Sequence, residues 1–188
     1  MRPVAITLLV LCACVAPPIL AGELAGVTYP DTIRVDSSTL VLNGLGLREA
    51  TLLKVDVYVA ALYLESRSAD ADAIVRSDRP RRLAMKFVRA VGRKDLVKAW
   101  NEGFEKSGPD APAALKDRIA TFNSFMIDMP NGGTMSFTAL PGKGVTVEVQ
   151  GDVKGTVPGA DFAQALFGIW LGPAPPNPGL KEGLLGKR

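Results

Sequence analysis

The sequence predicts an α+β fold, an open-faced β-sandwich in which an antiparallel sheet carries helices layered on one face. The first observation is the order of the patterns: stretches with a strand period come first, two helical stretches follow, and then further strands and a helix. A parallel sheet would instead require strands and helices in alternation. The second observation is residues 55–64, VDVYVAALYL, which are apolar at both alternating positions. Such a strand is covered on both faces, as in a layered fold.

The composition indicates one globular domain preceded by a leader. The chain has 188 residues, of which 47% are hydrophobic and 22% charged, enough for a single core. Residues 1–21 combine Arg2, an apolar run and a small residue at Ala21, the pattern of a secretory signal peptide. The run at residues 4–15 is shorter than the roughly 20 residues of a transmembrane helix. We therefore expect one domain at residues 22–188, periplasmic or secreted, with no membrane span.

The leader has one alternative interpretation. The sequence Leu11-Cys12-Ala13-Cys14 loosely resembles a lipoprotein processing site, which would leave the protein anchored by a lipid on Cys14. Both cysteines of the chain lie in this leader, so the mature domain would contain neither a thiol nor a disulfide.

The expected elements follow from the spacing of apolar residues and from turn residues. Strands are predicted where apolar residues alternate, and helices where they recur every three to four positions. The first half is expected to hold two short strands within residues 27–47 (turns at 29–31 and at Asn43-Gly44), the buried strand at 55–64, a short helix near 69–76 and a strand at 81–91. The second half is expected to hold a helix at 92–108, a helix after Pro112, strands at 134–139 and 145–150, a helix from Gly159 or Asp161 and, after a proline-rich break, a helix at 180–185.

Several kinds of chemistry are excluded by composition. The chain has no histidine, and its cysteines lie in the leader, so a Ser-His-Asp triad, a catalytic thiolate and a zinc site with nitrogen or sulfur ligands are excluded. We expect no metal and no cofactor. The run Gly44-Leu45-Gly46 lacks the third glycine of a dinucleotide loop, because position 49 is Glu49. The net charge of +3 is too small and too evenly spread to indicate nucleic acid.

Arg48 is the first candidate for chemistry. It lies just before the buried strand, and its guanidinium cannot lose its proton, so it must meet an anion or a polarised oxygen. The structural alternative is an ion pair with Glu49 or Asp56. Asp56 itself requires an exposed edge or a cation on a neighbouring strand.

The aromatic residues have a similar pair of interpretations. Tyr58 and Tyr63 lie on opposite faces of the buried strand, so at most one of them faces a pocket, and we favour Tyr58. Trp100 and Trp170 belong to apolar helix stripes, for which packing in the core is the expected role.

Two segments resemble the chalcone isomerase family. Residues 42–65 contain its glycine-rich turn, its arginine and a strand ending in ALYLE, and residues 162–186 are similar to its closing helix, glycine-rich break and final helix. The resemblance covers about residues 24–187 and is closest to the secreted bacterial branch. In the plant enzymes of this family an arginine holds the oxyanion while a phenolate closes a ring on an enone. A non-catalytic branch binds fatty acids, with the carboxylate on the arginine.

The resemblance assigns four candidate site residues. Arg48 matches the family arginine and Asn101 a family asparagine, whereas Tyr58 replaces a threonine and Lys94 replaces a tyrosine. The first functional hypothesis is a binding protein that holds a hydrophobic carboxylate, such as a fatty acid, on these residues. The alternative is an isomerase of the intramolecular lyase type that acts on an enone, with Arg48 as the catalytic residue. A third hypothesis is an interaction protein of the cell envelope without a ligand pocket. No oligomeric state is predicted.

Overall fold

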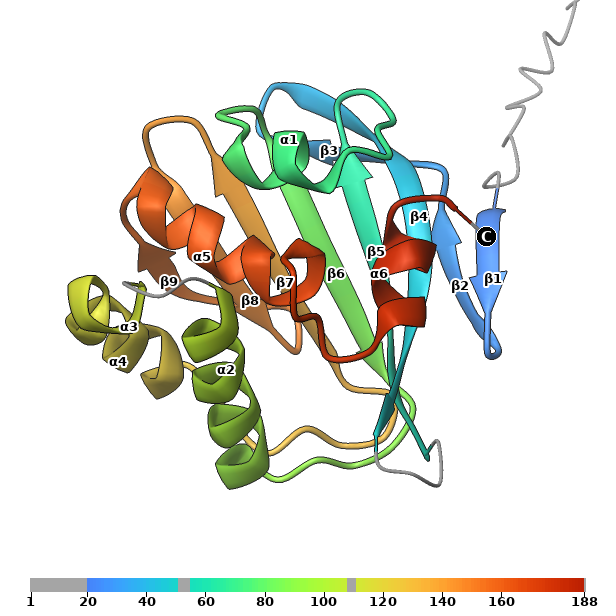
Figure 1. The fold of residues 1–188 in the computed structure, drawn as a ribbon. Coiled ribbons are helices and arrows are strands. Elements are labelled where there is room, and N and C mark those ends of the chain that lie inside the picture. The colour runs from blue at the N-terminus through green and yellow to red at the C-terminus, as the bar shows by residue number, and fades with distance from the viewer. Residues whose placement is uncertain (1–19, 51–54, 108–110, 188) are drawn as a thin grey trace, which may run out of the picture.

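The computed structural model describes residues 20–50, 55–107 and 111–187. Its centre is a curled antiparallel sheet of seven strands, in which each strand pairs with the next one along the chain (Figure 1). In order, these strands are β3 (Thr32–Val35), β4 (Ser38–Ala50), β5 (Val55–Leu64), β6 (Arg81–Phe87), β7 (Thr134–Leu140), β8 (Gly144–Val149) and β9 (Asp152–Val157).

The helices lie on one face of this sheet (Figure 1). They are α1 (Ala71–Arg76), α2 (Arg93–Ser107), α3 (Ala111–Ala114), α4 (Lys116–Ser124), α5 (Ala160–Leu171) and α6 (Pro178–Leu184). Helix α5 is buried along most of its length and carries Phe162 and Trp170 into the main core. None of the helices in the described ranges is long and apolar enough to cross a membrane.

A small hairpin packs near the first strands on the other face. It consists of β1 (Leu20–Leu24) and β2 (Val27–Pro30), which form a separate two-stranded sheet. Tyr29 of this hairpin packs against a second apolar cluster that includes Ala61 and Tyr63 of β5. The opposite side of β5, with Tyr58 and Leu62, belongs to the main core under the helices. The predicted fold class and the two-sided burial of this strand are therefore confirmed.

The predicted turn at Asn43-Gly44 is wrong, because β4 continues through it. The register against β5 shifts between Leu42 and Gly44, so Asn43 lies in a β-bulge inside the strand. Its side chain is buried and fully bonded: Nδ2 donates to the carbonyl oxygens of Ser68 (3.0 Å) and Leu184 (2.8 Å), and Oδ1 accepts from the Ser68 amide (2.8 Å). Asn43 thus joins β4 to the chain before α1 and to the end of α6.

Two further differences concern strands that the sequence did not predict. Strand β1 overlaps the end of the expected signal peptide, and residues 1–19 of that segment lie outside the described residues. Strand β9 has the sequence DVKGTV, which lacks a run of alternating apolar residues. It forms because the tight turn after β8 returns the chain along that strand.

Gly44 and Gly46 of β4 allow α6 to approach the sheet closely. A Cβ atom at Gly44 would clash with the carbonyl oxygen of Gly183, and one at Gly46 with the carbonyl oxygen of Leu180. The contact is backbone against backbone, so neither side can yield by changing a rotamer. The Asn177 side chain adds a second tie, since its Nδ2 donates to the Leu47 carbonyl oxygen at 3.1 Å. Gly44 and Gly46 therefore form the contact surface for α6 and do not form a turn.

We expect Gly44→Ala to lower the free energy of unfolding by about 1–3 kcal/mol, the usual cost of overpacking. The added methyl group has no space between β4 and α6. Gly92→Ala is the matched control, because a Cβ atom there meets its nearest atom, in Asp95, at 3.7 Å. Urea unfolding of both variants measures the difference. Equal free energies of unfolding in the two variants would contradict this role of Gly44.

Candidate functional site

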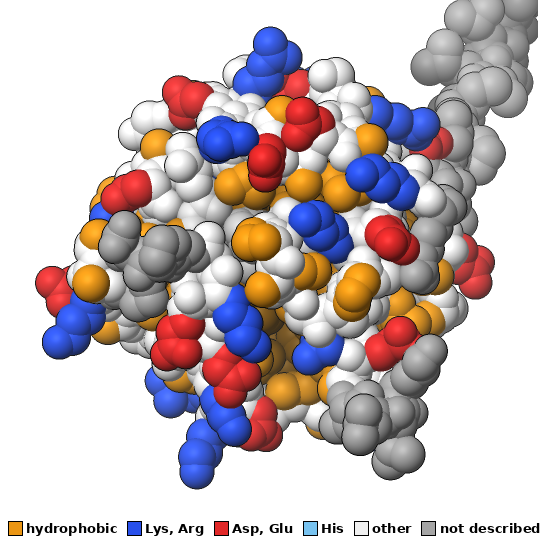
Figure 2. All heavy atoms as spheres, in the orientation of Figure 1, with side chains coloured by type: hydrophobic (Ala, Val, Ile, Leu, Met, Phe, Trp, Pro, Cys, Tyr) orange, Lys and Arg blue, Asp and Glu red, His pale blue; other side chains and the backbone are white. Residues whose placement is uncertain are grey.

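The candidate site is a cavity of about 360 Å³ between the ends of β4–β6, helix α2 and the connection from α5 to α6. Figure 2 shows a hollow in this region, with hydrophobic side chains at its floor and charged side chains around its rim. Its apolar wall includes Phe87, Leu96, Trp100, Ile169, Pro175 and Pro176. The proline-rich break of the sequence therefore supplies one side of the cavity.

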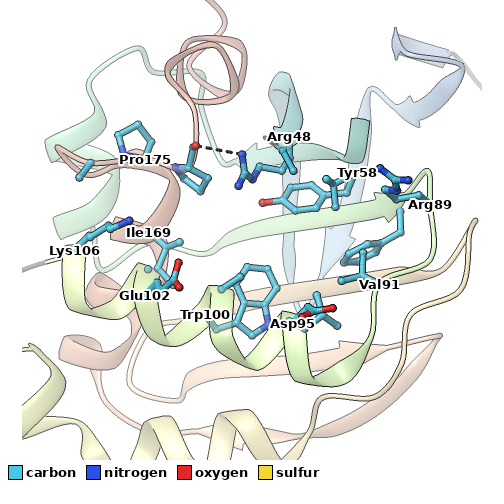
Figure 3. A pocket seen from close by; sticks show the side chains of 18 residues that line it. Arg48, Tyr58, Arg89, Val91, Asp95, Trp100, Glu102, Lys106, Ile169 and Pro175 are labelled. Atoms are coloured by element: carbon cyan, nitrogen blue, oxygen red, sulfur yellow. Dashed lines mark hydrogen bonds between the residues drawn. The ribbon is translucent and has the colours of Figure 1, made fainter. Parts of the chain in front are cut away.

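Arg48 and Tyr58 meet in this cavity from adjacent strands. They are direct partners in the antiparallel register of β4 and β5, so their side chains leave the sheet on the same face. Both line the cavity, and Figure 3 shows the guanidinium of Arg48 and the hydroxyl of Tyr58 directed towards its interior. The structure thus brings together two of the four residues that the sequence proposed.

The guanidinium of Arg48 is half-buried and has neutral partners. Its Nη1 donates to the backbone carbonyl oxygens of Glu49 and Pro176, the latter at 3.2 Å. Within the described ranges it forms no ion pair, so neither Glu49 nor Asp56 provides the carboxylate that the structural alternative required. Asp56 is exposed to solvent. The positive charge of Arg48 therefore lies at the wall of the cavity with no carboxylate in ion-pair contact among the described residues.

The hydroxyl of Tyr58 is a buried hydrogen-bonding group beside this charge. Tyr58 is only 4% exposed, and its Oη accepts a hydrogen bond from Nε1 of Trp170 at 2.9 Å. Burial raises the pKa of the hydroxyl from 10.0 to about 12, although the bond from Trp170 and the charge of Arg48 both act to lower it. Tyr58 is therefore a neutral phenol at physiological pH and can donate a hydrogen bond.

Both tryptophans belong to the core, as the sequence predicted, and Trp100 also lines the cavity. The rings of Trp100 and Trp170 lie 5.5 Å apart between centroids, and both residues are buried. Nε1 of Trp100 donates to the sulfur of Met126 at 3.2 Å, so the two indole N–H groups have different partners. The bond from Trp170 to Tyr58 joins residues 112 positions apart, which no sequence pattern could indicate.

Lys94 and Asn101 do not line the cavity. Lys94 is exposed, and Oδ1 of Asn101 accepts a hydrogen bond from Asn123 of α4 at 2.8 Å. The reason is the geometry of α2: successive residues are about 100° apart around a helix, and Asp95 and Glu102, one position later, line the cavity instead. The two residues that the resemblance assigned therefore lie on the helix that borders the cavity, but on a neighbouring face of it.

Charged residues at the rim were not assigned to the site from the sequence. Asp95, Glu102 and Lys106 of α2 line the cavity together with Arg89, which follows β6 (Figure 3). Their spacing of seven and then four positions on α2 is the only sequence signal that they share a face. In the described part of the chain, no three acidic, histidine or cysteine side chains cluster in a way that could hold a metal ion.

Comparison with known proteins identifies related chains. The sequence profile of the family described as chalcone isomerase-like matches residues 21–186. No curated protein sequence matches the chain. Among solved structures, the chain is similar to a fatty-acid binding protein from Arabidopsis thaliana, with a TM-score of 0.67 and 20% sequence identity. The alignment covers 86% of this chain and 93% of that one. At this identity the similarity shows a shared fold.

Burial of the tyrosines predicts a specific dependence on pH. Burial raises the pKa of all three tyrosines, that of Tyr29 well above its ordinary value and those of Tyr58 and Tyr63 to about 12. The unfolded chain releases these protons near pH 10, whereas the folded chain retains them. Their contribution to stability is therefore complete below about pH 10 and is lost as the pH rises towards 12.

Phenolate absorbance at 295 nm checks this expectation. The folded protein should show almost no phenolate at pH 10, and the same protein in denaturant should be about half ionised. Urea unfolding at pH 9 and pH 11 should show a smaller loss of stability for Tyr58→Phe than for the wild type. Half-ionised tyrosines in the folded protein at pH 10 would contradict the burial described above.

Proposed function

The chain belongs to the chalcone isomerase-like family, and within it we propose that the protein binds a hydrophobic carboxylate, such as a fatty acid, in the cavity beside Arg48. The observation that carries this proposal is a permanent cation that lines a partly apolar cavity and forms no ion pair with any described residue. A ligand that fits such a cavity has one anionic end and an apolar body.

The head group has suitable partners. Nη1 of Arg48 is bonded to carbonyl oxygens, and its other nitrogens donate no hydrogen bond to any described residue. A guanidinium can hold a carboxylate through two parallel N–H groups. The hydroxyl of Tyr58 can donate a third hydrogen bond, because its pKa of about 12 keeps it protonated. The side chains of Arg48 and Tyr58 together therefore offer three donors to a carboxylate in the cavity that both line.

The tail has an apolar environment. The cavity of about 360 Å³ is lined by Phe87, Leu96, Ile169 and the prolines of the α5–α6 connection. Ligand pockets in proteins are commonly about 300–1,000 Å³, and each buried methylene contributes about 0.8 kcal/mol. The Arabidopsis fatty-acid binding protein, which has this fold, supports the same class of ligand.

The alternative is an isomerase of the intramolecular lyase type acting on an enone or chalcone-like substrate. Arg48 would then hold the oxyanion of the substrate. Such a site uses several hydroxyl donors, and among the described lining residues only Tyr58 has a hydroxyl. Lys94 and Asn101, which the resemblance associated with the reaction, lie outside the cavity. The lining therefore supports ligand binding better than cyclisation.

We expect Arg48→Ala to weaken binding of dodecanoate by roughly 2–5 kcal/mol, the usual loss when one partner of a buried charged pair is removed. Arg48→Lys should recover only part of this affinity, because an ammonium cannot form the two-pronged contact. Isothermal titration calorimetry measures the affinities, and thermal melts show whether each variant folds.

Lys94→Ala is the matched control for these variants. It also removes one positive charge, but its side chain is exposed on α2 and outside the cavity. Binding of dodecanoate to this variant should match the wild type. Equal affinity in the wild type and Arg48→Ala would remove Arg48 from the site, and a large loss in Lys94→Ala would mean that the charge acts at long range.

We expect the protein to cyclise 2′-hydroxychalcone at close to the spontaneous rate. Removal of one oxyanion-site donor typically costs about 10²–10³ in rate, and the positions of Lys94 and Asn101 remove two candidate donors from this cavity. Stopped-flow absorbance measures the reaction, with protein-free buffer as the control. A rate far above the spontaneous one would favour the enzymatic alternative.

We also propose that residues 1–21 are a signal peptide and that the domain is exported. The support is the sequence pattern of Arg2, an apolar run and Ala21, and the family match begins at residue 21. N-terminal sequencing of the protein from fractionated cells should find Gly22 at or near the start. An intact Met1 in the cytosol would contradict export, and a lipid on Cys14 would favour the anchored form.

A further inference from the structure

We infer that Trp170 is a positioning residue that orients the Tyr58 hydroxyl as a donor to the ligand, so that the cavity favours a carboxylate over the alcohol of the same chain length. This inference rests on the proposed function, because it concerns the head group of the same ligand. Its starting point is the hydrogen bond of 2.9 Å from Nε1 of Trp170 to Oη of Tyr58.

The indole fixes the direction of the phenol. An indole N–H can only donate, so it occupies a lone pair of the Tyr58 oxygen and the phenol's own proton must point elsewhere. No described residue accepts that proton, and Figure 3 shows the hydroxyl facing the cavity. A buried donor without an acceptor carries a free-energy cost, which a ligand oxygen at this position would relieve.

The indole is itself held in place. Trp170 is 1% exposed, and its ring lies 5.5 Å from that of Trp100 and 5.8 Å from that of Phe137, between centroids. The ring of Tyr58 is fixed by an edge contact with Phe87, with centroids 5.4 Å apart. Neither partner can turn away without disturbing this packing. The donor direction of Tyr58 is therefore built into the core and does not depend on the ligand.

The consequence is a choice between two kinds of head group. An ionised carboxylate only accepts and offers about four lone-pair positions, enough for Tyr58 and for the nitrogens of Arg48 that donate to no described residue. An alcohol oxygen offers two, and its own O–H group meets donors where it needs an acceptor. A phenol released from Trp170 could rotate and accept from the alcohol. Trp170 thus disfavours binding of the alcohol as well as favouring binding of the carboxylate.

The test is a double-mutant cycle read with two probes, dodecanoate and 1-dodecanol. Trp170→Phe keeps an aromatic ring and removes the N–H group. It should weaken dodecanoate binding by about 3- to 10-fold, the range of a moderate hydrogen bond. It should also lower the ratio of the affinity for dodecanoate to the affinity for 1-dodecanol. In a Tyr58→Phe background the same substitution should change affinity by less than about 2-fold, as expected for two residues that act through one bond.

Trp100→Phe is the matched control. Its N–H group donates to the sulfur of Met126 and not to Tyr58, so its effect on affinity should be the same in both backgrounds. If Trp170→Phe also weakens binding equally in both backgrounds, Trp170 acts only by packing and the inference is overturned. A wild type that binds dodecanoate and 1-dodecanol equally would overturn it as well.

A second measurement needs no ligand. The chain has two tryptophans, so its ¹H–¹⁵N spectrum should contain two indole signals, assigned by their loss in Trp100→Phe and Trp170→Phe. Tyr58→Phe should shift the Trp170 signal and leave the Trp100 signal in place, and an unshifted Trp170 signal would overturn the inference. If the wild type fails to bind dodecanoate, the proposed function is overturned, and the inference that Trp170 selects the ligand is overturned with it. Binding that is unaffected by Trp170→Phe overturns this inference alone.

Discussion

Helix α6 can lie against the sheet only because β4 presents glycines where the two backbones meet. Gly44 and Gly46 leave no side chain in the contact, and Asn43 and Asn177 tie the ends of the helix to the strand. The position of α6 in turn fixes the connection from α5. The carbonyl oxygen of Pro176 in this connection accepts a hydrogen bond from the guanidinium of Arg48. The wall of the cavity and the orientation of its cation both depend on this close approach.

The other arginines of the fold show what is distinctive about Arg48. Arg118 and Arg82 have carboxylate partners, at 2.6 Å in Asp161 and 3.0 Å in Glu148. Arg81 is buried, but three backbone carbonyl oxygens and the ring of Phe167 surround its guanidinium. Unlike these three arginines, Arg48 lies at the wall of the cavity, next to Tyr58 in the sheet. It lacks a carboxylate partner among the described residues. A ligand with a carboxylate would supply the missing partner of Arg48.

The sequence predicted what depends on local pattern. Apolar residues at both alternating positions of β5 indicated a strand covered on both faces, and the apolar stripe of α2 indicated a helix on the sheet; both are correct. The turn at Asn43-Gly44 was wrong, because the same residue types that favour a turn also permit a bulge and a close helix contact. The bond from Trp170 to Tyr58 could not be predicted, since it depends on how α5 crosses a strand far away in the chain.

The most direct test of a carboxylate site at Arg48 is a crystal structure of the protein with 12-bromododecanoate. The account predicts electron density for the carboxylate between the guanidinium of Arg48 and the hydroxyl of Tyr58. The anomalous signal of the bromine should lie inside the same cavity, among the apolar residues of α2 and the α5–α6 connection. Bromine and carboxylate bound elsewhere, with this cavity unoccupied at saturating ligand, would contradict the account.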